Sequence, residues 1–153
     1  MAVTTEKKSI TVHIPLRWAD MDAYGHVNNA KMVQLLEEAR IAVFGCPPSS
    51  GQPLVGTTEP PFALFASMPD GVQALIAEHH IKYLSPLPYR ALPVPIQVSL
   101  LEVKPASIEL SYDIFDSDTG RQCVSASTVL VFYDTQTHGL VRLSRQQRQR
   151  LAR

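Results

Sequence analysis

Residues 17–45 read RWADMDAYGHVNNAKMVQLLEEARIAVFG, and a change of periodicity within this stretch decides the fold. The first part, through Asn29, is polar and rich in turn-forming residues. The second part places apolar residues at helical spacing, in a stripe formed by Met32, Leu35, Leu36, Ala39 and Val43. Asn28 or Asn29 suits the N-cap and Gly45 suits the left-handed stop. The pattern predicts an amphipathic helix over residues 30–44, about 22 Å long.

Elsewhere the chain alternates apolar and polar residues, which is the period of a half-buried strand. One such run precedes the helix at residues 9–18. The runs that follow it lie at residues 72–84, 94–103, 108–114 and 124–132. In the first of these we expect one face to carry Leu75, Ala77, His79, Ile81 and Tyr83. One strand, one helix and a series of antiparallel strands predict an α+β domain in which a single helix covers one face of an antiparallel sheet.

Three less regular segments complete the chain. Residues 46–71 are rich in Pro and Gly, and a connection of this length is often functional, for example as a wall or lid of a pocket. The sequence DSDTG at residues 116–120 predicts a hairpin loop. The basic tail at residues 139–153 is either a short helix or a frayed end. Because no repeat or boundary appears, we predict one domain over residues 1–153, with its core at about 9–134.

Composition narrows the choice of partners and location. The 153 residues include 14 basic and 14 acidic side chains, so the formal net charge is zero. Nucleic acids and membranes are therefore not expected partners, because binding either normally requires a surplus of Lys and Arg. No apolar run approaches the ~20 residues that span a bilayer, and no signal core is present, so a cytoplasmic location is expected.

Few side chains are available to bind a metal. Cys46 and Cys123 cannot by themselves form a disulfide framework or a four-ligand zinc site. His79 and His80 are adjacent in a predicted strand, so their side chains point to opposite faces. We therefore expect no metal at these side chains.

The motif RWxDxDxxGHVNN at residues 17–29, followed by an amphipathic helix ending in EEAR at residues 37–40, resembles the hot-dog-fold acyl-CoA thioesterases. The most similar branch includes 4-hydroxybenzoyl-CoA thioesterase and the bacterial long-chain acyl-CoA thioesterases. The segment IKYLSPL at residues 81–87 is similar to a strand of that family. The resemblance covers about residues 10–132. It implies a curved antiparallel sheet wrapped around one long helix, and a homodimer or dimer of dimers with active sites between subunits.

The same resemblance implies a hydrolase that releases a free acid and coenzyme A. It also implies no metal and no other cofactor, because coenzyme A is part of the substrate and product. Thioester hydrolysis needs a base or nucleophile at the carbonyl carbon and donors for the oxygen that becomes negative. Asp22 matches the family's catalytic carboxylate, which acts as nucleophile or general base. The backbone N–H of Asn29 is the candidate oxyanion donor, and Gly25 lets the loop backbone approach closely. His26 either orients the loop or transfers a proton, whereas Asp20 is expected to hold the loop.

Further candidates are substrate contacts: Asn28 at the helix start and, in the later segment, Lys82, Tyr83, Ser85, Pro86 and Arg90. Asn28 equally suits a helix cap. Tyr83, Ser85 and Pro86 match the family segment that lines the neighbouring protomer's site. Lys82 and Arg90 suit the phosphates of coenzyme A, although solvation at the surface explains them equally well.

Three alternatives stay open from the sequence. Some hot-dog thioesterases place the catalytic carboxylate on the helix, so Glu37 and Glu38 are alternatives to Asp22. A hydratase or dehydratase on the same fold would pair an acidic residue with a histidine, but the Asn-Pro-x-His spacing of such enzymes is absent at residues 23–26. A non-enzymatic acyl-CoA-binding domain is the third.

Overall fold

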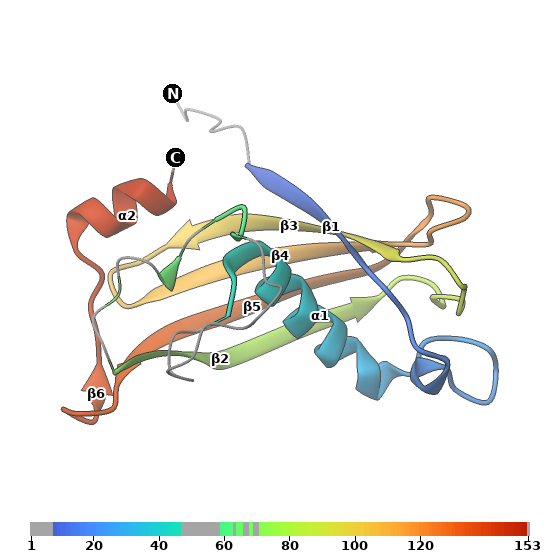
Figure 1. Ribbon diagram of the computed structural model, residues 1–153, viewed down its shortest axis with the longest axis horizontal. Helices are drawn as coiled ribbons and strands as arrows, with labels where there is room; N and C mark the ends of the chain where they lie inside the picture. The colour runs from blue at the N-terminus through green and yellow to red at the C-terminus, as the bar shows by residue number, and fades with distance from the viewer. Residues whose placement is uncertain (1–7, 47–58, 63, 66–67, 69–70, 153) are drawn as a thin grey trace.

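The computed structural model describes residues 8–46, 59–62, 64–65, 68 and 71–152 (Figure 1). Its elements follow the predicted order of one strand, one long helix and a series of strands. They are β1 (Ser9–Ile14), the short 3-10 helix η1 (Trp18–Asp20), α1 (Asn29–Phe44), β2 (Val72–Tyr83), β3 (Val94–Val103), β4 (Ser107–Phe115), β5 (Gln122–Asp134), β6 (Gly139–Leu140) and α2 (Arg145–Leu151).

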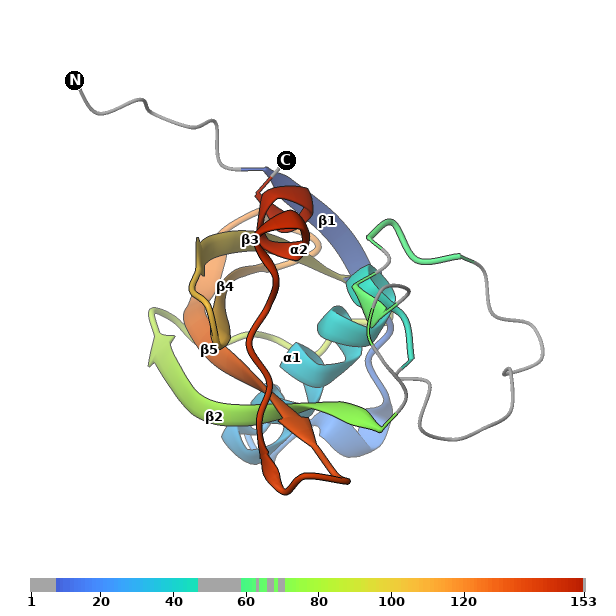
Figure 2. The ribbon, with the colours of Figure 1, turned by 90° about the vertical axis from the view of Figure 1, so that its left-hand side faces the viewer.

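The sheet is antiparallel, with strand order β1-β3-β4-β5-β2, and β6 pairs with the end of β5. Figure 2 shows the sheet curling around α1, which lies in its concave side. The structure confirms the predicted α+β architecture, in which a curved antiparallel sheet wraps around one long helix.

Helix α1 begins and ends where the sequence predicts. Its N-cap is Asn28, whose Oδ1 accepts a hydrogen bond from the Ala30 N–H at 3.0 Å. It ends at Gly45, whose φ of 78° is in the left-handed region that favours glycine. The predicted apolar stripe is buried, with exposed fractions of 0–4% at Met32, Leu35, Leu36, Ala39 and Val43. Burial of each large side chain in this stripe stabilises the fold by about 1.5–3 kcal/mol, so the stripe fixes α1 against the sheet.

The predicted face of β2 is wrong for part of the strand. A bulge lies between Ile76 and Glu78, where Ile76 pairs with Leu130 and Glu78 pairs with Val129. The extra residue shifts the alternation, because side chains in a strand change face with each residue. Leu75, which pairs with Val131 before the bulge, therefore does not share a face with His79, and Ala77 is the extra residue with no partner in the register. The side chains that face α1 are those of Ala74 and Ile76 before the bulge and of His79, Ile81 and Tyr83 after it.

The ends of the predicted strands also differ. Strand β1 ends at Ile14 instead of reaching Trp18, because residues 18–20 form η1. The basic tail forms the short helix α2, whose N-cap Ser144 accepts from the Gln147 N–H and whose Leu151 is buried. Most of the segment at residues 46–71 lies outside the described residues, but its Leu64 and Phe65 line a cavity that is described below.

Candidate active site

The loop between η1 and α1 folds back on itself. The Asn28 N–H donates to the Asp20 carbonyl at 2.8 Å, and the Asp22 N–H donates to the His26 carbonyl at 2.7 Å. Between these bonds Met21 pairs with Val27. Two short antiparallel segments therefore return the chain from Asp22 to the start of the helix.

A second segment holds the other side of this loop. The Val27 N–H donates to the Leu87 carbonyl at 2.8 Å, and the Tyr89 N–H donates to the Gly25 carbonyl at 2.9 Å. Gly25 has a φ of 78°, so the turn at this position favours glycine. The segment that follows β2 is itself fixed to β5, because the Ser85 N–H donates to the Cys123 carbonyl at 3.1 Å. The structure thus brings the predicted residues around Ser85 and Pro86 to the same end of the fold as Gly25 and His26.

The carboxylate of Asp22 is fixed through one of its oxygens. Its Oδ1 accepts from the backbone N–H groups of Tyr24 at 2.8 Å and His26 at 3.1 Å. The other oxygen, Oδ2, accepts no hydrogen bond from any described residue. Asp22 is half-buried, so one oxygen is oriented by the loop while the second is available to a reactant or water.

The first turn of α1 leaves one backbone donor unused. The Asn28 side chain accepts from the Ala30 N–H, and the Asn28 carbonyl accepts from the Lys31 N–H at 2.9 Å. The N–H of Asn29 has no acceptor among the described residues. It lies at the positive end of the helix dipole, where an anionic oxygen is stabilised. The capping interpretation of Asn28 is therefore confirmed.

Asp20 stabilises the start of the loop through hydrogen bonds with Arg17. It is buried and accepts from the Arg17 N–H at 2.8 Å and from Arg17 Nη2 at 3.1 Å. Burial by itself would raise the pKa of Asp20, but the hydrogen bonds and charge of Arg17 outweigh this effect, so the pKa lies below its usual value. Asp20 thus fixes η1 and the start of the loop, as the sequence analysis expected.

At the end of β2, the two predicted substrate contacts Lys82 and Tyr83 lie on opposite faces of the sheet. Tyr83 faces α1, where its hydroxyl donates to the Asn29 carbonyl at 3.4 Å, and its side chain is half-exposed. Lys82 pairs with Ser125 and lies on the opposite, outer face of the sheet. Tyr83 therefore lies beside the helix start, whereas the proposal that Lys82 contacts phosphate stays a prediction.

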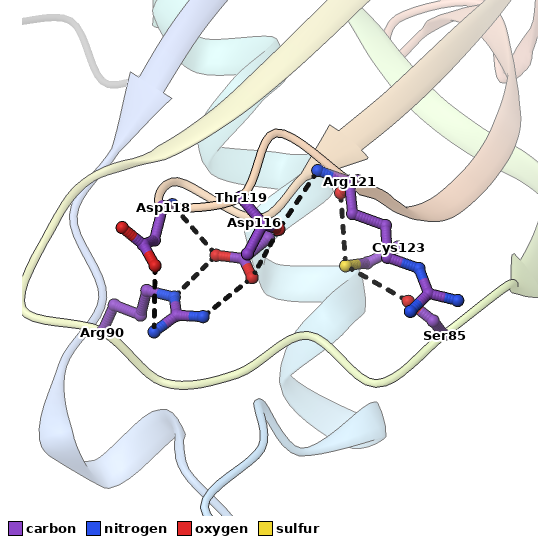
Figure 3. Close-up of polar contacts among 7 residues, drawn as sticks. All are labelled: Ser85, Arg90, Asp116, Asp118, Thr119, Arg121 and Cys123. Atoms are coloured by element: carbon purple, nitrogen blue, oxygen red, sulfur yellow. Dashed lines mark hydrogen bonds and ion pairs between the residues drawn. The ribbon is translucent and has the colours of Figure 1, made fainter.

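Arg90 takes part in an ion pair that the sequence analysis did not identify (Figure 3). Its Nε and Nη2 donate to the two carboxylate oxygens of Asp116 at 2.6 and 2.9 Å, and its Nη1 lies 3.9 Å from Asp118 Oδ2. The Arg90 hydrogen bonds hold the pKa of Asp116 well below its usual range. This pair ties the segment before β3 to the β4–β5 hairpin, and a contact between Arg90 and phosphate stays a prediction.

A cavity of about 220 Å³ lies between α1 and β2. Its walls are mainly apolar, with two charged side chains, Glu37 and Arg40, on the helix. Arg40 Nη1 donates to the Tyr112 hydroxyl at 3.3 Å. Sequence reasoning gave Arg40 no role, although its position beside the buried stripe, three residues after Glu37, was the available signal. The apolar wall residues are Ile41, Phe44, Leu64, Phe65, Ala74, Ile76 and Leu130.

The described residues contain no group of three or more His, Cys, Asp or Glu side chains close enough to hold a metal ion. None of the described helices has the length and apolar character needed to cross a bilayer. The absence of a cofactor and the cytoplasmic location stay predictions.

The sequence model of the thioesterase-like superfamily matches residues 16–151, and the chain belongs to this family. The protein is therefore a thioester hydrolase, and its curved sheet around one helix is the hot-dog fold.

Solved structures agree on the fold. The YbaW protein of Escherichia coli is 22% identical, with a TM-score of 0.69 over 94% of this chain and 96% of that one. A Thermus thermophilus thioesterase complexed with coenzyme A and zinc is 20% identical, with a TM-score of 0.65 over 92% and 95%. A 1,4-dihydroxy-2-naphthoyl-CoA thioesterase from Synechocystis is 16% identical, with a TM-score of 0.65 over 94% and 96%. A search of curated proteins found no significant match.

Proposed function

We propose that the protein hydrolyses acyl-CoA thioesters to a free acid and coenzyme A at a site formed by the Asp22 carboxylate and the Asn29 N–H. The observation that carries this proposal is the unused Asn29 N–H, at the positive end of α1, on the loop that also fixes the Asp22 carboxylate. Family membership supports the reaction type. The coenzyme A complex of the Thermus thermophilus relative and the naphthoyl-CoA substrate of the Synechocystis relative support coenzyme A as the carrier.

The Asn29 N–H acts on the carbonyl oxygen of the thioester. As the carbonyl carbon becomes tetrahedral, this oxygen gains negative charge, which the N–H and the helix dipole stabilise. Loss of one such donor in a hydrolase lowers the rate by ~10²–10³-fold. Asn28 contributes indirectly, because its cap holds the first turn and leaves the neighbouring N–H free.

The Asp22 carboxylate supplies either a base or a nucleophile. As a base, it removes a proton from water while the water oxygen bonds to the carbonyl carbon; the C–S bond then breaks and the thiolate takes up the proton. As a nucleophile, it bonds to the carbonyl carbon and expels the thiolate, and water then hydrolyses the mixed anhydride. Rapid quenching of a single turnover distinguishes the two routes, because only the second route forms an acyl-enzyme.

A second copy of the chain is part of the proposal. Strand β2 is an edge of the sheet and exposes Leu75, Ile76 and Tyr83 by 40–51%. A long edge strand with exposed apolar side chains favours pairing with another strand. We expect a homodimer, or a dimer of such dimers, with Tyr83, Ser85 and Pro86 beside the bound substrate. Light scattering tests this against the 16.9 kDa of one chain.

The test of the activity is a panel of acyl-CoA thioesters with detection of free thiol. The expected result is thiol release that depends on enzyme concentration and persists after treatment with a chelator. Loss of enoyl-CoA absorbance without thiol release would instead indicate a hydratase. Tight binding measured by calorimetry, without turnover of any substrate, would indicate a binding domain.

A further inference from the structure

The side of α1 that faces β2 offers space for a ligand beyond the thioester itself. At the helix start, Tyr83 contacts Asn29 across this side. Farther along the helix lies the 220 Å³ cavity, between the last two turns of α1, from Glu37 to Phe44, and the β2 residues Ala74 and Ile76. Since a cavity of about 150 Å³ accommodates benzene, this one has room for the end of an acyl chain.

Arg40 brings a positive charge to the wall of this cavity. Arg40 is half-buried, and among the described residues its guanidinium makes one hydrogen bond, to the hydroxyl of the fully buried Tyr112. Among the described residues no carboxylate lies within 4.0 Å of it, whereas Arg17 and Arg90 each pair with an aspartate. Because a partly buried charge without a counter-ion is costly, the remaining guanidinium donors suit an anionic ligand.

The neighbouring groups do not neutralise this charge. His79 faces α1 and bonds Thr128 Oγ1 through Nδ1 at 2.9 Å. Burial lowers the pKa of His79, and the positive charge of Arg40 lowers it further. Glu37 lines the cavity, but it is exposed and forms no ion pair with Arg40. Among the described residues that line the cavity, Arg40 is the one cation, so a carboxylate brought into the cavity would meet its guanidinium.

We propose that Arg40 selects acyl groups that carry a carboxylate at the end remote from the thioester. The proposal rests on the proposed function, which places the thioester carbonyl at Asn29. Arg40 is eleven residues farther along α1, or about 16 Å at 1.5 Å per residue. An extended chain advances about 1.2 Å per bond, so a twelve-carbon chain reaches about 13 Å, and a hydrogen bond of about 3 Å at its carboxylate end completes the distance. The planar guanidinium matches a carboxylate through two parallel hydrogen bonds.

The experiment compares two substrates of equal length, dodecanedioyl-CoA (the monothioester) and dodecanoyl-CoA. The quantity measured is the ratio of their kcat/KM values. Hydrogen bonds to a charged group predict that Arg40→Gln lowers this ratio about tenfold or more, mainly through KM for the carboxylated substrate. Arg40→Lys retains the positive charge but not the two parallel hydrogen bonds, so it lowers the ratio less than Arg40→Gln does.

Two further variants separate charge from structure. Glu37→Gln removes a negative charge from the cavity wall and is expected to raise the ratio. Arg145→Gln removes an exposed arginine from α2 and leaves the ratio unchanged. Circular dichroism and thermal unfolding confirm that each variant is folded.

An unchanged ratio in Arg40→Gln would overturn the proposal. This includes an equal loss of kcat/KM on both substrates, which a purely structural role predicts. If the wild type hydrolyses dodecanoyl-CoA and Asp22→Asn does not, such a result refutes the role of Arg40 and leaves the proposed function intact. If the wild type releases thiol from neither substrate nor from the wider panel, the proposed function fails and this inference fails with it.

Discussion

Replacing Asp116 by asparagine tests how the hairpin between β4 and β5 supports the site. The Asp116 carboxylate accepts from Arg90 Nε and Nη2, from the Asp118 N–H at 3.0 Å and from Thr119 Oγ1 at 3.0 Å. Asparagine has one acceptor oxygen and no charge, so it can retain only part of this set. The substitution therefore leaves the Arg90 guanidinium without its counter-ion.

The expected cost follows from burial and geometry. The Asp116 side chain is 6% exposed, and its contact with Arg90 is bidentate. The Arg90 side chain is 31% exposed, so the pair is only partly buried. Hydrogen bonds to charged groups contribute about 1.5–3 kcal/mol, and we expect a loss of about 2 kcal/mol because one acceptor remains. At about 2–4 °C per kcal/mol for a chain of this size, Tm falls by about 4–8 °C. Activity falls as well, because Arg90 closely follows Leu87 and Tyr89, which hold the Asp22 loop.

Urea and thermal unfolding at several pH values measure the effect. The pKa of Asp116 is lower in the folded state than its ordinary value of 3.8. The pair therefore contributes its full stability above about pH 4 and loses it as pH falls through 3.8 toward the folded pKa. The difference in unfolding free energy between wild type and Asp116→Asn should shrink over that range.

The matched control is Asp118→Asn. Asp118 lies 3.9 Å from Arg90 Nη1 and is 65% exposed, so the substitution costs less than about 0.5 kcal/mol. If Asp116→Asn and Asp118→Asn have the same small effect, or if the Asp116 difference grows in acid, the structural role given to this pair is wrong.

The remaining predictions concern the Asp22 loop and the helix start. Asn28→Ala removes the cap of α1 and lowers the free energy of unfolding by about 1 kcal/mol, whereas Asn28→Asp keeps an acceptor and most of that stability. Urea unfolding measures both variants, and equal losses would refute the capping role. Asp20→Asn weakens the bonds to Arg17 and costs about 1–2 kcal/mol. Because the folded pKa of Asp20 is lowered, this contribution is present above pH 3.8 and declines in acid, and an acid titration of unfolding that shows the opposite trend would contradict it.

The sequence predicted those parts of the fold that depend on local periodicity. The stripe from Met32 to Val43 defined the buried face of α1, and Asn28 and Gly45 defined its ends. The hairpin loop at residues 116–120 followed from its turn-forming composition, and its Gly120 has a φ of 71°. These features depend on residues close together in the chain, so a single amino-acid sequence is enough to predict them.

The features that the sequence missed depend on distant partners. The β2 bulge places Leu75 and His79 on opposite faces, and nothing in the composition of the strand marks it. Arg90 meets Asp116 across 26 residues. The contact of Arg40 with Tyr112 spans 72 residues and arises only when α1 crosses the sheet. Such contacts follow from strand order and register, which periodicity does not determine.

The most direct test of the central claim is the rate of thiol release by Asp22→Asn, measured beside the wild type and Asp20→Asn on the best acyl-CoA of the panel. Asparagine preserves the shape of Asp22 and an oxygen acceptor for the N–H groups of Tyr24 and His26. It removes the charge that either route requires. We predict that Asp22→Asn loses at least about 10²-fold in kcat while it stays folded, in the range that a catalytic acid or base contributes, whereas Asp20→Asn keeps most of the rate. A folded Asp22→Asn variant with the wild-type rate would contradict the account.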